Sequence, residues 1–155
     1  MEINDLIGYI ARFILTGPKE MRVTSPVLIV DDDLDLLEFL RAFVESCCTV
    51  PTLGVADGGM VLSQVRSEQP ALILLDVNLP VRNGWEVLAD LKAEESTRSI
   101  PIIMMSAGAD PGNERRALSL GAAAFVDKPF DLPELETLIH VHVPDPKRCT
   151  SIGTS

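Results

Sequence analysis

The sequence predicts an α/β protein built on a doubly wound parallel sheet with helices on both faces. Five short apolar runs alternate with segments whose apolar residues recur at helical spacing. The runs are almost continuously apolar, which is typical of parallel strands buried on both faces. With 155 residues, the chain is long enough for one domain with a substantial core.

The first strand–helix unit begins with "VLIV" at residues 27–30, a short run rich in β-branched residues. The helical spacing that follows predicts a helix over 34–46. A second strand is expected over 49–55, and it contains Pro51. Because proline cannot donate a ladder hydrogen bond, this strand should lie at an edge of the sheet.

The later units follow the same alternation. They are a helix over 57–67, a strand over 71–75, a helix over 85–95, a strand over 100–106, a helix over 111–120, a strand over 122–127 and a last helix capped by Asp131. The resulting order of five strand–helix units leaves no room for a second domain, so the domain is expected over 25–141.

The two ends of the chain differ from this core. Apolar residues at helical spacing predict an extra amphipathic helix over 3–15, ended by Gly17 and Pro18. Within the extension 1–24, that helix could pack on the domain or mediate a homodimer, and Met21 could also be the translation start. The tail 142–155 lacks periodicity.

Composition excludes several classes of function. A net charge of −10 argues against nucleic-acid binding, which needs a basic surface. No apolar run reaches the length of a membrane span, and the first residues do not resemble a signal peptide. The three cysteines lack the spacing of a disulfide framework or a zinc site. We expect a cytoplasmic protein that is not bound to membranes.

Reactive side chains follow four of the predicted strands. Asp31 and Asp32 follow the first strand, Asp76 the third, Ser106 the fourth and Lys128 the fifth. In an open α/β sheet the ligand site lies beyond the carboxyl ends of the strands, so these groups should converge on one rim.

Crowded carboxylates repel one another unless a positive group compensates them. A hard cation with oxygen ligands is the natural partner, and Mg²⁺ prefers a few carboxylates with several waters. The backbone carbonyl of Asn78 could complete the ligand set of Asp31, Asp32 and Asp76. An oxygen of Asp76 could then attack phosphorus, with Lys128 and Ser106 holding the phosphoryl oxygens.

These residues stand in four stretches, "VLIVDDD", "LILLDVNLPVRNG", "IIMMSA" and "FVDKPF". In this order and spacing, they resemble the receiver domain of two-component response regulators, over residues 25–140. The resemblance implies a flavodoxin-like (βα)5 fold with strand order 2-1-3-4-5, which agrees with Pro51 in an edge strand. Single-domain chemotaxis-type receivers share this organisation.

The resemblance also implies roles for single residues. By position, Asp76 resembles the phospho-acceptor, and Asp31 and Asp32 resemble the acidic pair that binds Mg²⁺. Asn78 resembles the residue that lends a carbonyl to the metal, and Lys128 the phosphate-binding lysine.

Further positions match the family's switch. Ser106 takes the place of the switch hydroxyl, and Phe125 takes the place of the switch aromatic. The Lys128–Pro129 bond resembles the family's cis peptide. Gly108 offers no side chain that could orient a hydrolytic water, so the acyl phosphate should last longer than seconds.

We therefore expect a stand-alone receiver that is not an enzyme beyond its own phosphoryl transfer and dephosphorylation. A sensor histidine kinase or a histidine phosphotransfer protein would donate the phosphoryl group. A downstream protein would bind the surface made by the helix over 111–120, the strand over 122–127 and the last helix.

Two alternatives remain at this stage. "DDDLD" also contains the D-x-D of haloacid-dehalogenase-type phosphatases, which would use Asp31 and Asp33. That interpretation leaves Asp76 without a role. The other alternative is a degenerate receiver that binds partners without phosphorylation.

Four further polar residues are given structural interpretations. Asp33 and Asp35 are interpreted as helix-start acids, and His140 and His142 as part of a solvated terminus.

Overall fold

The computed structural model describes residues 3, 25–108 and 110–143. Its five strands form one parallel sheet in the order β2-β1-β3-β4-β5. They are β1 (Val27–Val30), β2 (Thr52–Val55), β3 (Leu72–Asp76), β4 (Ile102–Ser106) and β5 (Ala124–Asp127). The flavodoxin-like order expected from the sequence is confirmed, and so is the edge position of β2.

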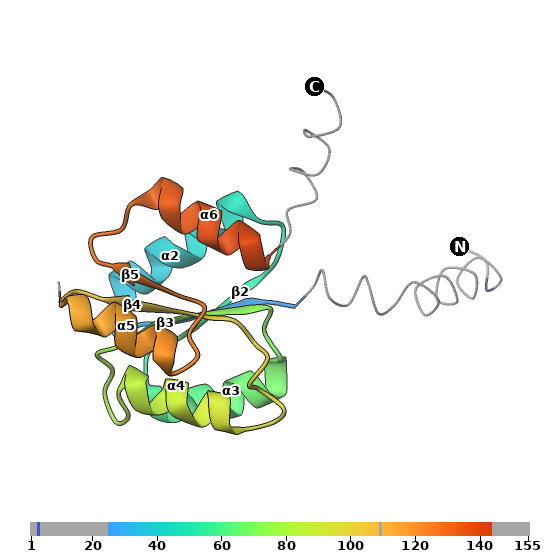
Figure 1. The fold of residues 1–155 in the computed structure, drawn as a ribbon. Helices are drawn as coiled ribbons and strands as arrows, with labels where there is room; N and C mark the ends of the chain where they lie inside the picture. Colours follow the sequence, from blue (N-terminus) through green and yellow to red (C-terminus); the bar gives the residue numbers. More distant parts are fainter. Residues whose placement is uncertain (1–2, 4–24, 109, 144–155) are drawn as a thin grey trace.

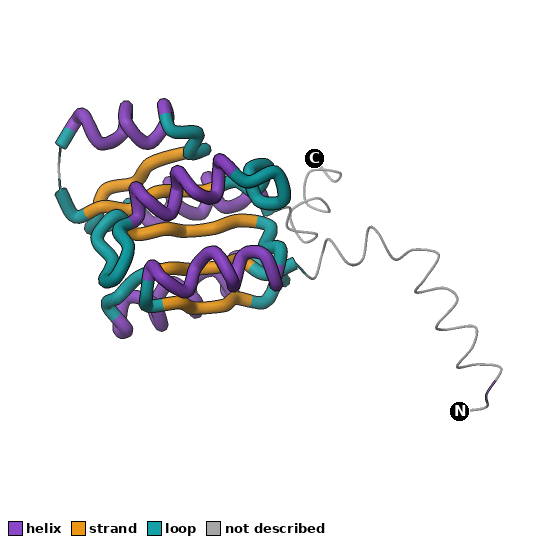
Figure 2. Tube along the Cα trace, turned by 90° about the horizontal axis from the view of Figure 1, so that it is seen from below, coloured by secondary structure: helices purple, strands orange, loops and turns teal. Residues whose placement is uncertain are grey.

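Helices cover both faces of this sheet (Figure 1). They are α2 (Leu34–Cys47), α3 (Val61–Glu68), α4 (Gly84–Ala93), α5 (Pro111–Ser119) and α6 (Leu132–His142), with a 3-10 turn η1 (Gly58–Met60) before α3. α2 and α6 lie on one face, and α3, α4 and α5 lie on the other. Seen from below, in Figure 2, the strands run side by side between the two helical layers.

The apolar strands supply a core on each face. Side chains of β1, β3 and β4 point alternately to the two sides, as the period of two in a strand requires. On one side they pack against buried residues of α3, α4 and α5, including Val65, Leu88 and Ala117. On the other side they pack against Leu40 of α2 and Ile139 of α6. Central strands buried on both faces explain why their runs contain so few polar residues.

Short polar side chains begin the helices. Asp33 accepts hydrogen bonds from the backbone N–H groups of Asp35 and Leu36, at 3.1 and 3.2 Å, and so caps α2. This confirms the interpretation of Asp33 and Asp35 as helix-start acids. Asp131 caps α6 in the same way, as expected, by accepting from the N–H of Glu134.

Several element boundaries differ from the sequence-based prediction, among them the starts of β2 and of the helix over 57–67 and the end of β3. β2 begins at Thr52, after Pro51, whose carbonyl accepts a hydrogen bond from the N–H of Val27 at 3.0 Å. The helix predicted over 57–67 begins as the 3-10 turn η1, capped by Asp57. β3 runs one residue further than predicted, so the backbone of Asp76 is itself part of the sheet.

The prediction that His140 belongs to a solvated terminus was wrong. α6 continues to His142, and the His140 side chain is 8% exposed, with Nε2 3.5 Å from a carboxylate oxygen of Glu136. Because residues two apart in a helix point to different sides, His140 and His142 are not placed to share a ligand.

The extra helix predicted over 3–15 lies outside the described residues, apart from residue 3. The proposed division at residues 24 and 141 remains a prediction. Among the described residues, no helix is both long enough and apolar enough to span a membrane.

Gly84, the first residue of α4, fits tightly behind the end of β3. A β-carbon there would lie 2.2 Å from the backbone oxygen of Asp76, a distance that forces the backbone to move. We expect Gly84→Ala to lower the free energy of unfolding by about 1–3 kcal/mol, the usual cost of overpacking. Urea denaturation would measure this.

Gly108→Ala is the matched control for this substitution. A β-carbon at Gly108 would meet only the Ser106 hydroxyl oxygen, at 3.8 Å. Its effect on the free energy of unfolding should stay within about 0.5 kcal/mol. Equal losses from both substitutions would contradict the packing argument.

Candidate functional site

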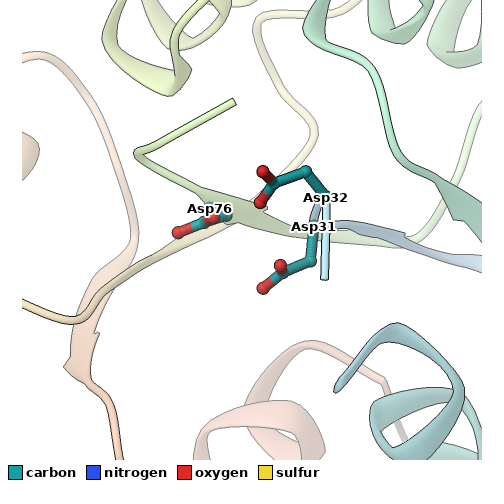
Figure 3. A group of neighbouring side chains, drawn as sticks. All are labelled: Asp31, Asp32 and Asp76. Atoms are coloured by element: carbon teal, nitrogen blue, oxygen red, sulfur yellow. The ribbon is translucent and has the colours of Figure 1, made fainter. Parts of the chain in front are cut away.

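Three carboxylates meet at the carboxyl ends of β1 and β3 (Figure 3). Asp31, Asp32 and Asp76 each bring a carboxylate oxygen within 4.8 Å of the other two. The sheet produces this arrangement, because β1 and β3 are neighbours and Val30 pairs with Leu75. The next residue in each strand direction is an acid, Asp31 after Val30 and Asp76 after Leu75. The convergence expected from the sequence is therefore present for all three acids.

The three acids differ in burial and in partners. Asp31 is fully buried and Asp76 is 3% exposed, whereas Asp32 is exposed to solvent. Asp31 accepts a hydrogen bond from the backbone N–H of Asp33 at 2.9 Å. Consecutive residues at the end of a strand point to opposite sides, which gives Asp31 a buried place and Asp32 an open one.

Lys128 joins two of these acids. It follows β5, and its Nζ lies 2.6 Å from Oδ2 of Asp31 and 3.3 Å from Oδ1 of Asp76. Burial lowers the pKa of Lys128, but its hydrogen bond to Asp31 and the charges of both acids outweigh that effect, so its pKa is raised. The ammonium therefore stays charged. The peptide bond between Lys128 and Pro129 is cis, as expected.

Asp76 has a raised pKa. Burial is the largest cause, and the charge of Asp31 adds to it. Lys128 and a hydrogen bond with the Asn78 backbone act in the opposite direction without cancelling the increase. The surroundings of Asp76 thus hold too little positive charge to balance its ionised form, and this favours binding of a cation beside it.

Ser106 ends β4 at the same rim and is buried. Its backbone oxygen accepts a hydrogen bond from the N–H of Lys128 at 2.8 Å, which holds the serine and the lysine at neighbouring strand ends. Its hydroxyl oxygen accepts from the N–H of Gly108 at 3.2 Å. Ala107 and Gly108 are exposed, so no bulky side chain of theirs covers the site.

Phe125 lies apart from the carboxylates. It is half-buried in β5, paired in register with Met104, and packs against the core on the side of α3, α4 and α5. Asn78 is exposed in the loop after β3. The role of its carbonyl as a metal ligand remains a prediction.

The donor set suits a hard divalent cation. When all four groups are ionised, the three carboxylates and the one ammonium leave two negative charges uncompensated. The ligand atoms that the carboxylates offer are oxygens. Mg²⁺ takes oxygen ligands and carries the charge that would balance this deficit. The residues therefore fit the metal that was expected from the sequence. Among the described His, Cys, Asp and Glu residues, no other group of three or more is placed to hold an ion.

Sequence reasoning missed the close contact between Lys128 and Asp31. It assigned the lysine to the phosphoryl group alone, whereas here its shortest contact is with the buried acid. The two residues are 97 positions apart in the chain. Only the strand order, which places both at one rim, brings them together.

Comparison with known proteins points to one family. Residues 27–140 match the family model described as response regulator receiver domain. The polar-differentiation response regulator DivK of Brucella ovis is 34% identical over 117 residues, which cover 75% of this chain and 94% of that protein. A probable cyclic di-GMP phosphodiesterase of Vibrio cholerae is 30% identical over 118 residues, but the match spans only 26% of its length.

Solved structures agree with these matches. The receiver domain of a sensor histidine kinase from Pseudomonas aeruginosa, crystallised with a magnesium ion in its active-site cleft, is similar with a TM-score of 0.69 and 27% identity. The similarity covers 77% of this chain and 98% of that domain. Sheet order, acidic rim and family match agree, and the chain belongs to the response regulator receiver domain family of two-component signalling.

Proposed function

We propose that this receiver accepts a phosphoryl group on Asp76 and changes its partner-binding surface in response. One observation carries the proposal: Asp76 lies at the rim of the sheet, next to a lysine ammonium and two further carboxylates. An isolated strand-end acid would not need this arrangement, but a nucleophile that must carry a phosphoryl dianion would.

The proposed donor is phosphohistidine, on a sensor histidine kinase or a histidine phosphotransfer protein. A carboxylate oxygen of Asp76 attacks phosphorus, the phosphorus–nitrogen bond breaks, and the released imidazole nitrogen takes up a proton. The product on Asp76 is an acyl phosphate. Because ATP, the source of phosphohistidine, is cytoplasmic, we place the protein there.

Asp31, Asp32, Asp76 and the carbonyl of Asn78 would hold Mg²⁺. When bound, the metal would neutralise charge on the phosphoryl oxygens during transfer. With Asp31 engaged in the metal site, Lys128 would move from Asp31 to a phosphoryl oxygen.

Ser106 and Phe125 would transmit the change. The Ser106 hydroxyl, now bonded to Gly108, would turn to the phosphoryl group. Phe125 would turn inward and alter the surface formed by α5, β5 and α6, a population shift between two arrangements. That surface is the proposed site for a downstream protein. A stand-alone receiver and a homodimer both remain predictions.

Asp76→Asn should abolish phosphoryl labelling, because an amide oxygen is a far weaker nucleophile than a carboxylate. Phosphotransfer from a radiolabelled kinase or a small phosphodonor would measure this. Asp33→Asn is the matched control, since asparagine still caps α2. Its labelling should match that of the unmodified protein. Full labelling of Asp76→Asn, or hydrolysis of a generic phosphate ester that depends on Asp31 and Asp33, would sink the proposal.

Binding of Mg²⁺ should raise the melting temperature of the protein, and this gain should shrink as the pH falls. A metal that binds only the folded state stabilises it, and the carboxylates must be deprotonated to bind. Since the pKa of Asp76 is raised, the loss should begin at a higher pH than for an ordinary aspartate. Thermal scans with and without Mg²⁺ at several pH values test this.

A comparison of Asp76→Asn with the unmodified protein, both without Mg²⁺, tests the direction of the Asp76 pKa shift. Ionising an acid with a raised pKa costs stability at every pH above that pKa. Without Mg²⁺, the variant should therefore be more stable than the unmodified protein at neutral pH, and the difference should vanish in acid below the ordinary aspartate pKa. A difference that grew in acid would contradict the direction assigned to Asp76.

The acyl phosphate should persist well beyond seconds, because no side chain at Gly108 can orient a water. A side chain would fit at this position, since a β-carbon would meet only the Ser106 hydroxyl. Gly108→Gln should shorten the lifetime on the order of tenfold or more by orienting the water. Gly112→Gln, on the exposed first turn of α5, is the control. Decay of the unmodified acyl phosphate within seconds would refute this account.

A further inference from the structure

β5 forms one edge of the sheet and runs between α5 and α6 (Figure 1). A groove lies along this edge. It consists of two adjoining hollows with volumes of about 230 and 220 Å³. Both are lined by Glu114 of α5 and by Phe125 and Asp127 of β5. Because the hollows share these residues, they lie side by side between the start of α5 and the start of α6, and together they are called the groove.

The apolar lining of this groove includes two aromatic rings. Phe125 lines both hollows, and Phe130 and Leu135 line the larger one. Phe125 and Phe130 are only half-buried, so their rings are still partly open to solvent. Leu118 of α5 is 48% exposed and lies one helical turn beyond Glu114. Partly open rings beside an exposed leucine provide apolar area that a partner could cover.

Among the described residues, every charged side chain that lines the groove is an acid: Asp110, Glu114, Asp127, Asp131 and Glu134. Within the described part of the chain, none of them forms an ion pair with a lysine or arginine. Arg115 is next to Glu114 in sequence but lines neither hollow.

The five acids are not equivalent. Asp110 and Asp131 already accept hydrogen bonds from the backbone at the starts of α5 and α6. Glu114, Asp127 and Glu134 are exposed, and helix capping does not account for them. Three acids on three different elements thus face the same groove without a structural role.

We propose that this groove binds a basic segment of a partner protein, with an apolar side chain of that segment against Phe125. Lysine or arginine residues of the segment would pair with Glu114, Asp127 and Glu134. Charge complementarity of this kind speeds association and excludes wrong partners. The inference rests on the proposed function, because it assigns a chemical class of partner to the proposed output surface.

A second copy of this chain does not fit the same groove. A two-fold interface places one patch against the identical patch of the other subunit. The acids of α5, β5 and α6 would then face the same acids, with no cation of the groove between them. The groove therefore favours a different, basic protein over a homodimer through this face.

Phe125 links the groove to the phosphorylation site. Its ring lines both hollows, so an inward turn of the ring would open space at their junction. Phosphorylation of Asp76 would then create room for the apolar anchor, while the acids stay in place. Basic segments should consequently bind the phosphorylated protein more tightly than the unphosphorylated protein.

Three synthetic helical peptides would test the proposal. They share one apolar face, and their polar positions carry either lysine and arginine, glutamine, or glutamate. Calorimetric titration into the full chain, with and without phosphorylation, should give binding only for the basic peptide. Affinity should weaken as salt is added, and amide chemical shifts should change around Phe125.

A pair of charge-reversal variants makes the test specific. Glu114→Lys with Glu134→Lys should weaken the basic peptide on the order of tenfold or more. Glu38→Lys with Glu68→Lys changes the net charge equally on α2 and α3, and should leave the affinity almost unchanged. Both double variants should still be labelled on Asp76 at the normal rate.

Three outcomes would overturn the proposal. One is equal binding of the glutamine or glutamate peptide, and another is an equal loss from both double variants. The third is peptide binding that appears only after Lys147→Ser with Arg148→Ser, which would assign the groove to the chain's own tail. Failure of Asp76 labelling would instead refute the proposed function, and titration of the unphosphorylated protein would still judge the groove.

Discussion

The rest of the acidic rim depends on the contact of one ammonium with two buried acids. Lys128 holds Asp31 at 2.6 Å and Asp76 at 3.3 Å, which permits carboxylates to crowd at the end of a low-dielectric core. Burial and the charge of Asp31 raise the pKa of Asp76, and Lys128 opposes that increase. Even with Lys128, the pKa of Asp76 stays raised. The charge of Lys128 offsets part of the negative charge of the acids, and the rim still carries more negative than positive charge.

Much of the fold and of the acidic rim could be predicted from the sequence, because strands buried on both faces have a distinctive composition. The run "VLIV" and the run before Asp76 can hardly be exposed, and the residue that follows each run must then lie at the rim. Convergence of Asp31, Asp32, Asp76, Ser106 and Lys128 follows from topology alone. The edge position of β2 likewise followed from the chemistry of Pro51.

Other features depend on distances that no pattern encodes. The preference of Lys128 for Asp31 depends on side-chain reach across the rim, and the burial of His140 depends on how far α6 continues. The acidic groove combines single acids from α5, β5 and α6, each of which looks in sequence like an ordinary surface charge. Partners separate the two acidic regions: Asp31 and Asp76 of the rim are buried and share Lys128. Three exposed acids of the groove have no ion pair with a lysine or arginine among the described residues, namely Glu114, Asp127 and Glu134.

The order of the strands also divides the molecule into a stiff part and a compliant part. β1 and β3 carry the acids and have a hydrogen-bonded neighbour on each side. Distorting them would break two ladders at once, so Asp31 and Asp76 should keep their positions until the whole domain unfolds. β5, which carries Phe125, is bonded to β4 alone. Motion at that margin disturbs a single ladder, and the receiver can thus change its outer face without loosening the acidic rim.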